Sequence, residues 1–282
     1  MPAPLDPGTA RDRFRALADA PDSSIDLALG ALLIACEDEP ESQVVVEAEL
    51  DALEQLADGI RPHLQGAVSD HDLVSRLNTC LFDELGFEGN RDDYYDPRNS
   101  FLNAVLERRR GIPITLCLLY VEVARRLGLD AYGVGFPGHF LAKVVGDSEI
   151  IVDAFQGRTL TRDDCTAQLR SAFGPNAELT PKLLQATGPR QILARMLTNL
   201  KQIYLQQRRL ESAVACCDRI LLLEPEAALE LRDRGMLYQA LECFGPAADD
   251  LERFLLLAPA HESAQQVQTV LAGLRGRVAK LN

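Results

Sequence analysis

The chain has 282 residues, of which 47% are hydrophobic and 25% charged, as expected for one large or two ordinary globular domains. Its net charge of −13 disfavours binding to nucleic acid and to anionic membranes. No apolar run reaches about 18 residues, so we expect no transmembrane helix. The first residues lack the basic start and apolar core of a secretory signal, and we therefore expect a cytoplasmic protein.

The seven cysteines and four histidines give no metal-binding pattern. The cysteines are odd in number, and most lie within apolar helical patterns, which is typical of reduced, buried thiols. No pair has zinc-finger spacing, and the histidines are scattered. We therefore expect no metal site and no cofactor.

The pattern over residues 10–85 predicts helices throughout, with Ser42 as one candidate start. Residues 86–99 are polar and aromatic and indicate a loop. Ser100 is a candidate cap for a short helix that follows. A helix over 114–126 then ends at Gly128, and because it is apolar nearly all round, we expect it to be central and buried.

Short strand patterns follow this central helix. Residues 131–136, 140–145 and 149–154 are separated by Pro137-Gly138 and by Gly146-Asp147-Ser148, which predicts a small antiparallel sheet. Residues 161–173 indicate another helix, and 174–188 a connector. The expected class is therefore α+β, mostly helical, with one central helix against a small sheet.

The C-terminal third repeats with a period of 34 residues. The pairs that recur at this offset are Tyr204 and Tyr238, Ala213 and Ala247, and Pro225 and Pro259. This is the tetratricopeptide period, with an aromatic in the first helix, a small residue in the second and a proline between repeats. We expect two repeats and a capping helix over 188–282, and a separate first domain over 1–187. The array is either a concave surface for a peptide or protein partner, or a helical platform that binds nothing.

The most informative segment lies between Tyr94 and Phe155. It reads YYDPRNSFLNAVLERRRGIPITLCLLYVEVARRLGLDAYGVGFPGHFLAKVV, followed shortly by IIVDAF. This segment closely resembles the transglutaminase-like, papain-like core of the bacterial SirB family, in which the core precedes tetratricopeptide repeats. The resemblance extends over about residues 25–275.

The resemblance implies a catalytic triad of cysteine, histidine and aspartate, with the cysteine opening the central helix. His139 matches the family's histidine at a strand start, and Asp153 matches the aspartate on the next strand. Counting back from Gly128, the cysteine position falls at Pro113 or Ile114. Neither side chain can attack a carbonyl, so the resemblance indicates a domain that has lost its nucleophile.

Two other residues near this position carry nucleophilic groups. Cys117 lies three or four residues further along, a displacement of about 4.5–6 Å along the helix axis. Its leucine neighbours favour an inert thiol packed in the core over a displaced nucleophile. Thr115 is more typical of a helix cap than of a catalytic hydroxyl.

Polar residues before the central helix form a candidate ligand cleft, for which loop scaffolding is the alternative interpretation. They are Tyr94, Tyr95, Asp96, Asn99 and Asn103.

The sequence favours a non-catalytic protein-interaction or regulatory protein. The alternative is a cysteine-dependent acyl-transfer enzyme, namely a peptidase, deamidase or transglutaminase, that uses Cys117, His139 and Asp153. The sequence leaves the partner and the oligomeric state open.

Overall fold

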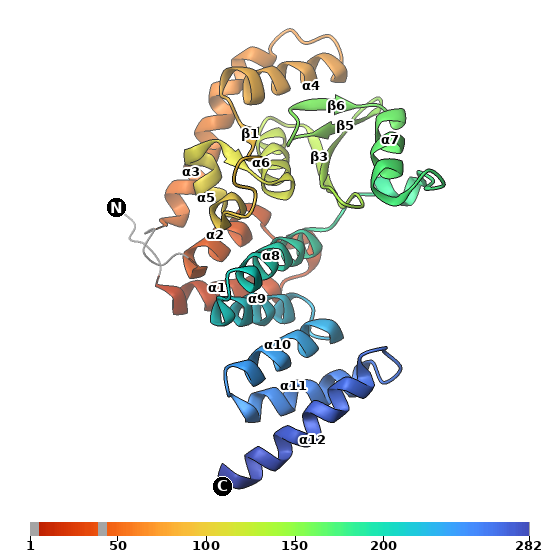
Figure 1. Cartoon of the computed structure of the whole chain (residues 1–282). Coiled ribbons are helices and arrows are strands. Elements are labelled where there is room, and N and C mark those ends of the chain that lie inside the picture. The colour runs from red at the N-terminus through yellow and green to blue at the C-terminus, as the bar shows by residue number, and fades with distance from the viewer. Residues whose placement is uncertain (1–5, 39–43, 282) are drawn as a thin grey trace. The chain divides into compact units, whose positions relative to one another are not determined.

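The computed structural model describes residues 6–38 and 44–281, and its contacts divide the chain into two compact units. The first ends at Leu193 and the second begins at Ala194. In the first unit the α-helices are α1 (Pro7–Ala18), α2 (Leu27–Asp38), α3 (Val46–Ile60), α4 (Asp70–Asn78), α5 (Leu102–Arg108), α6 (Pro113–Arg126) and α7 (Arg162–Phe173). This mostly helical chain with small sheets confirms the predicted α+β class (Figure 1).

Local sequence signals start several of these helices. Asp6 caps α1 by accepting a hydrogen bond from the Thr9 backbone N–H at 3.1 Å, and Ser69 caps α4 by accepting one from the Asp72 N–H at 3.2 Å. Thr161 and Asp164 form a reciprocal capping box at the start of α7. These polar caps fix where each helix begins.

Two helices are buried on nearly every side. Most residues of α2 are buried, and α6 is buried from Pro113 to Ala124, as its apolar sequence predicts. The one acid in that span, Glu122, is paired with Arg126 at 2.5 Å. A charged side chain at this depth needs such a partner.

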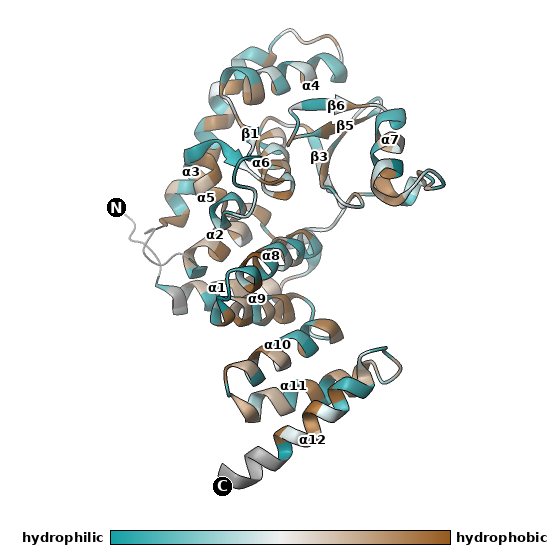
Figure 2. Ribbon diagram, in the orientation of Figure 1, coloured by the Kyte–Doolittle hydropathy of each residue, from teal (hydrophilic) through white to brown (hydrophobic). Residues whose placement is uncertain are grey.

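The main sheet is antiparallel with strand order β3-β4-β5-β6. Its strands are β3 (Asp130–Val134), β4 (Leu141–Val145), β5 (Glu149–Asp153) and β6 (Arg158–Leu160). Val134, Leu141 and Ile151 on one face pack with Cys165 and Leu169 of α7. The sheet lies between α6 and α7 (Figure 1), and the mixed brown and teal of α7 in Figure 2 reflects its one apolar face.

Four local features differ from the sequence predictions or fall beyond them. Residues 110–111 pair in parallel with 88–89, within the expected loop, and form β2 (Arg110–Gly111) and β1 (Glu88–Gly89). Strand β6 was not predicted. Ser100 is not a cap, because Phe101 precedes the first turn of α5 and the Ser100 side chain makes no capping bond. Ser42 lies outside the described residues.

The second unit is an array of antiparallel helices. Its members are α8 (Pro189–Gln206), which begins in the first unit, α9 (Leu210–Leu223), α10 (Ala228–Ala240), α11 (Phe244–Leu257) and α12 (Ala264–Leu281). The residues of the 34-residue repeat occupy equivalent places: Ala213 and Ala247 are fully buried, and Pro225 and Pro259 lie in the turns between repeats.

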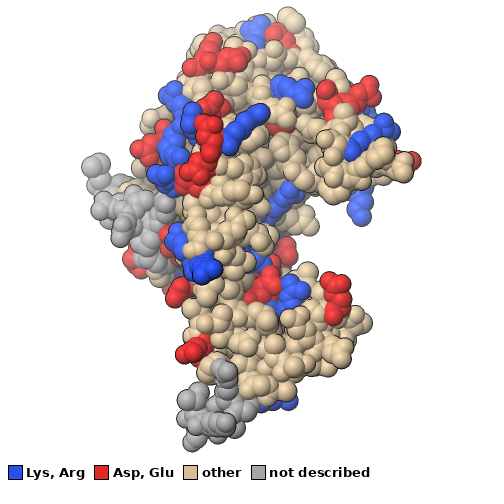
Figure 3. All heavy atoms as spheres, viewed as in Figure 1, with Lys and Arg blue, Asp and Glu red and all other residues tan. Residues whose placement is uncertain are grey.

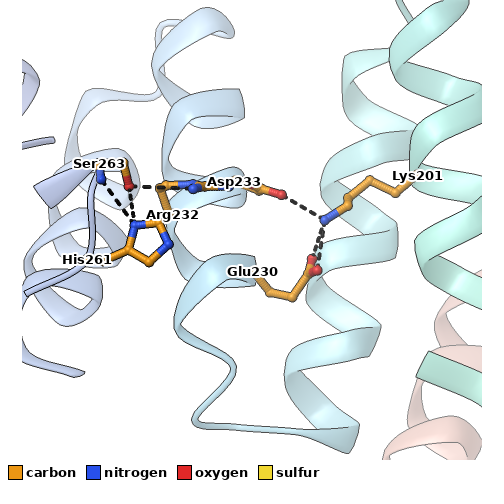
Figure 4. Close-up of polar contacts among 6 residues, drawn as sticks. All are labelled: Lys201, Glu230, Arg232, Asp233, His261 and Ser263. Carbon is orange, nitrogen blue, oxygen red and sulfur yellow. Dashed lines mark hydrogen bonds and ion pairs between the residues drawn. The ribbon is translucent and has the colours of Figure 1, made fainter. Parts of the chain in front are cut away.

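Buried ion pairs join the helices of this array. Lys201 of α8, with 2% of its side chain exposed, donates to both carboxylate oxygens of Glu230 at 2.8 and 2.7 Å and to Asp233 at 2.9 Å (Figure 4). Arg234 of α10 binds both oxygens of Asp250 and one of Asp218, each at 2.7 Å. The repeats are therefore held in register by charge as well as by apolar packing.

Candidate functional site

The first turn of α6 carries no thiol. Pro113 is the first residue of the helix, Ile112 precedes it without a side-chain cap, and Ile114 is buried. Thr115 is also fully buried, and its hydroxyl has no hydrogen-bond partner within the described residues. A cysteine at this end of a helix would gain thiolate character from the helix dipole, but neither residue at the counted position carries a thiol.

Cys117 lies one turn further along and is sealed in the core. None of its surface is exposed, and its thiol donates a hydrogen bond to the Leu141 carbonyl oxygen at 3.0 Å. Burial raises the pKa of Cys117 far above the ordinary value of a thiol, and the nearby charge of Asp153 raises it further. The thiol is therefore held in its protonated, weakly nucleophilic form.

The structure brings His139 and Asp153 together. His139 Nε2 lies 2.9 Å from Asp153 Oδ2, and Asp153 is fully buried at the end of β5. The other carboxylate oxygen accepts hydrogen bonds from the backbone N–H groups of Phe155 and Gln156, both at 3.1 Å. These bonds tie the Asp153 carboxylate to the turn after β5, and the imidazole lies against its other oxygen.

Gln168 is a member of this site that the sequence analysis missed. It projects from α7, and its side-chain amide donates to Asp153 Oδ2 at 3.4 Å. It also lines a pocket of about 260 Å³ beside the histidine. The residues around this pocket are Phe136, Pro137, Gly138, His139, Gln156, Gln168, Ser171 and Ala172. No sequence signal marks Gln168, because only the tertiary packing of α7 on the sheet places it there.

A second, more polar pocket of about 440 Å³ shares Gln156 with the first. Phe155 lines it, and the Arg91 guanidinium lies over the Phe155 ring at 5.5 Å from its centre. The same ring contacts His139 and Tyr94 edge-on, at 6.2 and 6.3 Å between ring centres. Phe155 is thus an aromatic wall between the histidine and the second pocket.

The five residues of the candidate ligand cleft fall into different environments. Tyr94 and Tyr95 are exposed, with 40% and 57% of their surface accessible. Asp96 and Asn99 are buried, where Asp96 pairs with Arg98 and Arg108 and Asn99 bonds Asn90 and the Asp93 carbonyl.

Asn103 is partly buried within α5. None of the five lines either pocket beside Phe155. Asp96 and Asn99 stabilise the loop before α5, while the two tyrosines are exposed at its surface.

Comparison with known proteins identifies the class of these two units. Residues 47–198 match the transglutaminase-like superfamily, and residues 200–272 match a tetratricopeptide repeat family. Among solved structures, the crystal structure of menin that reveals the binding site for Mixed Lineage Leukemia (MLL) protein has a TM-score of 0.53 over 99% of this chain and 68% of menin. Their sequences are 13% identical, so this likeness concerns the fold alone.

Relatives that are similar over most of their length identify the family within this class. A UPF0162 protein of Xylella fastidiosa is 37% identical over 93% of this chain and 94% of its own length, and one of Vibrio cholerae is 32% identical over 92% and 96%. SirB1 of Salmonella typhimurium is 26% identical over 77% of this chain and 82% of its own. The chain belongs to the SirB-type family of transglutaminase-like proteins, as its sequence predicted.

Two observations bear on the expected partners. No helix in the described ranges combines the length and apolarity needed to cross a membrane. On the face shown in Figure 3, acidic and basic side chains are interspersed, so that face offers no continuous basic patch for a phosphate backbone.

Proposed function

We propose that this protein is a non-catalytic interaction or regulatory protein, in which a degenerate transglutaminase-like domain supports a partner-binding repeat array. The state of Cys117 carries the proposal. Its thiol is fully buried and bonded to the Leu141 carbonyl, and Pro113 and Ile114 occupy the start of the helix where an active member would hold its nucleophile. A buried thiol with a raised pKa is a poor nucleophile.

The alternative is cysteine-dependent acyl transfer through Cys117, His139 and Asp153. The 2.9 Å contact between His139 and Asp153 favours it, since this is the arrangement that orients a general base. It requires the Cys117 thiol to leave Leu141 and reach solvent. The same contact has a structural explanation, because Asp153 also accepts the two backbone N–H groups of the turn after β5.

Thiol labelling distinguishes these two functions. We expect Cys117 in the folded protein to react with a small alkylating probe at neutral pH no faster than the other buried cysteines. A Cys243→Ser background removes the exposed cysteine of the described chain, and mass spectrometry of peptides assigns the labelled site. Fast, stoichiometric labelling of Cys117 that disappears in His139→Ala would overturn the proposal in favour of the enzyme.

The repeat array offers a place for a partner. Tetratricopeptide repeats generally mediate protein–protein interaction, and this array has a pocket of about 410 Å³ between α8, α9 and α10. Leu229, which is 47% exposed, lies on the pocket wall. Menin, which shares the fold, is described with a binding site for MLL protein, so protein binding by this fold has a precedent. We infer that an apolar side chain of a peptide or protein partner docks at this pocket.

Two exposed leucines of the array test this docking site. Leu229→Glu places a charge on the pocket wall, whereas Leu256→Glu changes a leucine that is 81% exposed and lines none of the pockets described above. In a quantitative pull-down from the cytoplasmic fraction, we expect Leu229→Glu to lose the partners that the full chain retains and Leu256→Glu to keep them. Loss in both variants, or in neither, contradicts docking at this pocket. A chain ending at residue 198, where the transglutaminase-like match ends, separately tests whether the first domain binds.

A further inference from the structure

Three metal-binding side chains that are scattered in the sequence meet in the first unit. His63 lies in the 3-10 turn after α3, spanning Arg61–Leu64, while Cys80 and Glu84 lie in the turn that extends α4. The ligand atoms of the three side chains all lie within 4.8 Å of one another. Within the described ranges, this is the one group of three or more such side chains with that spacing.

An uncommon helix geometry presents two of these side chains. Thr79–Glu84 is a π-helix, in which the Leu85 N–H donates to the Cys80 carbonyl at 2.9 Å, one residue wider than an α-helical bond. Cys80 and Glu84 are four residues apart, and this spacing places side chains on one face of a helix. Single π-turns within α-helices occur frequently at functional sites.

The turn that carries His63 is anchored on two sides. Arg76 of α4 donates to the His63 carbonyl at 3.3 Å and to the Gln65 carbonyl at 2.9 Å, while binding both oxygens of Asp72. Arg61 donates to the Arg126 carbonyl at the end of α6 at 3.1 Å. Because α4 and α6 hold the backbone of this turn, the position of the His63 imidazole relative to Cys80 is fixed.

The three side chains also share a cavity of about 240 Å³. Cys80 is buried at 3% exposure, whereas His63 and Glu84 are exposed at the cavity's edge. The remaining wall is formed by Gln55, Leu56, Gly59, Ile60 and Leu85. The wall contains no Lys or Arg, so no cationic side chain of the cavity opposes a bound cation.

We propose that His63, Cys80 and Glu84 form a binding site for a divalent cation of the zinc class. A thiolate, an imidazole and a carboxylate are the three ligand types that zinc takes in proteins. Zinc prefers four tetrahedral ligands, so the three side chains leave one position for water or for a group of a ligand in the cavity. Magnesium and calcium prefer sites made of oxygen ligands alone, and a thiolate disfavours both.

Charge and proton balance are consistent with this choice. Binding forms a bond from the metal to Cys80 Sγ and releases the thiol proton to solvent. The thiolate and the Glu84 carboxylate then neutralise the two positive charges of the ion, while His63 binds as neutral imidazole. Without a metal, burial raises the pKa of Cys80, and the charge of Glu84 adds to this effect.

This site is separate from the function proposed above and departs from the expectation of no metal site. Sequence spacing did not reveal it, because the ligands come from a turn and a π-helix that only tertiary contacts bring together. The site contains none of the residues around His139 and Asp153, nor any residue of the repeat array. Its test is therefore independent of whether the protein is catalytic or binds a partner.

Metal titration of the full chain tests the proposal. We expect one zinc ion per chain, measured by competition with a chromophoric chelator, and no comparable binding of magnesium. With cobalt in place of zinc, a thiolate-to-metal charge-transfer absorption in the near ultraviolet should report the Cys80 bond. His63→Ala and Glu84→Gln should each weaken zinc binding by more than about tenfold, since outer-shell substitutions alone reach that size.

Matched variants keep the result interpretable. Cys80→Ser should remove the cobalt charge-transfer band, whereas Cys243→Ser, which changes an exposed cysteine of the repeat unit, should leave both band and affinity unchanged. His63 is exposed, so His63→Ala remains informative if Cys80→Ser fails to fold, and circular dichroism checks folding in each case. Zinc binding that is absent, or that persists unchanged in His63→Ala and Glu84→Gln, overturns the proposal.

Discussion

Asp153 shows how one buried carboxylate can stabilise both a turn and the position of a histidine. Its carboxylate is fully buried, and one oxygen accepts hydrogen bonds from the N–H groups of Phe155 and Gln156. The other oxygen accepts one from Gln168 and lies against His139. A buried hub of this kind is costly to remove, since every donor around it then lacks a partner. The contact between His139 and Asp153 therefore has a structural role that does not depend on catalysis.

We expect Asp153→Ala to lower the free energy of unfolding by about 2–4 kcal/mol, because it orphans two backbone N–H groups and the Gln168 amide. His139→Ala should cost only about 1 kcal/mol, since Asp153 keeps its other donors. Urea unfolding of both variants measures the difference. If both variants lose the same free energy of unfolding, Asp153 contributes through its contact with His139 and not through the turn after β5.

At the residue scale, the sequence predicted the site residues that belong to a motif but not those that only tertiary packing brings together. The proximity of His139 and Asp153 follows from the resemblance, whereas the loss of the nucleophile, inferred by counting back from Gly128, stays a prediction. Gln168 and the group of His63, Cys80 and Glu84 could not be predicted, because each side chain lies on a different element or in an unusual turn. These side chains come together only through the packing of helices, and no local sequence pattern predicts that packing.

Lys201 illustrates a charge that links two elements. It joins α8 to α10 through Glu230 and Asp233 and is almost completely buried. We expect Lys201→Met to destabilise the protein by about 2–4 kcal/mol, because it leaves two facing carboxylates without this cation. Arg275→Met removes an exposed ion pair with Glu252 in the same unit and should cost at most about 1 kcal/mol. Thermal unfolding of both variants compares them, and similar losses would contradict a special role for the buried lysine.

The contribution of Lys201 should also depend on pH in a defined direction. Burial acts to lower the pKa of Lys201, but its bonds to Glu230 and Asp233 outweigh burial, and the pKa is raised. A raised pKa in the folded state means that the stabilisation is complete below the ordinary lysine pKa of about 10.4 and is lost as pH rises through the folded value. As pH rises from 7, the stability difference between wild type and Lys201→Met should therefore stay constant and shrink only in strong alkali. A difference that shrinks between about pH 7 and 9 would contradict this assignment.

Helix packing gives a second prediction at the element scale. A Cβ added at Gly235 of α10 would lie 2.8 Å from Leu251 of α11, closer than side chains tolerate. We expect Gly235→Ala to cost about 1–2 kcal/mol despite its better helix propensity. Gly273 of α12 has no described atom within 4 Å of such a Cβ, so Gly273→Ala should stabilise by about 0.5–1 kcal/mol. Urea unfolding midpoints measure both changes, and a neutral Gly235→Ala would show that the two helices separate easily.

At the element scale, strong periodicity predicted the structure well. The central helix, three strands and the repeat helices appear where their patterns place them, with Ala213 and Ala247 both fully buried. The short strands β1, β2 and β6 carry too few residues for a pattern. Ser100 has the right residue type for a cap, but it lies in a 3-10 turn that ends at that residue, and the turn sets the start of α5 instead.

At the scale of the whole molecule, the open question is where the first domain ends. The sequence suggests residue 187, but the first compact unit extends to Leu193. The Arg190 N–H donates to Asp22 at 3.0 Å, and its guanidinium donates to the carbonyls of Ala18 and Ala20 at 2.9 and 2.8 Å. Ile192 and Leu193 are also buried, at 3% and 0% exposure. The start of α8 thus contributes to the core of the first unit.

A chain ending at residue 187 should therefore be less stable than one ending at residue 198, where the transglutaminase-like match ends. Loss of the buried Ile192 and Leu193 side chains alone should lower the free energy of unfolding by about 3–6 kcal/mol, at about 1.5–3 kcal/mol each. Urea unfolding of the two fragments, with Leu193→Ala in the longer one as a control of intermediate stability, measures this deficit. If both fragments unfold at the same urea concentration, the domain ends at residue 187 and the first turn of α8 belongs to the repeats.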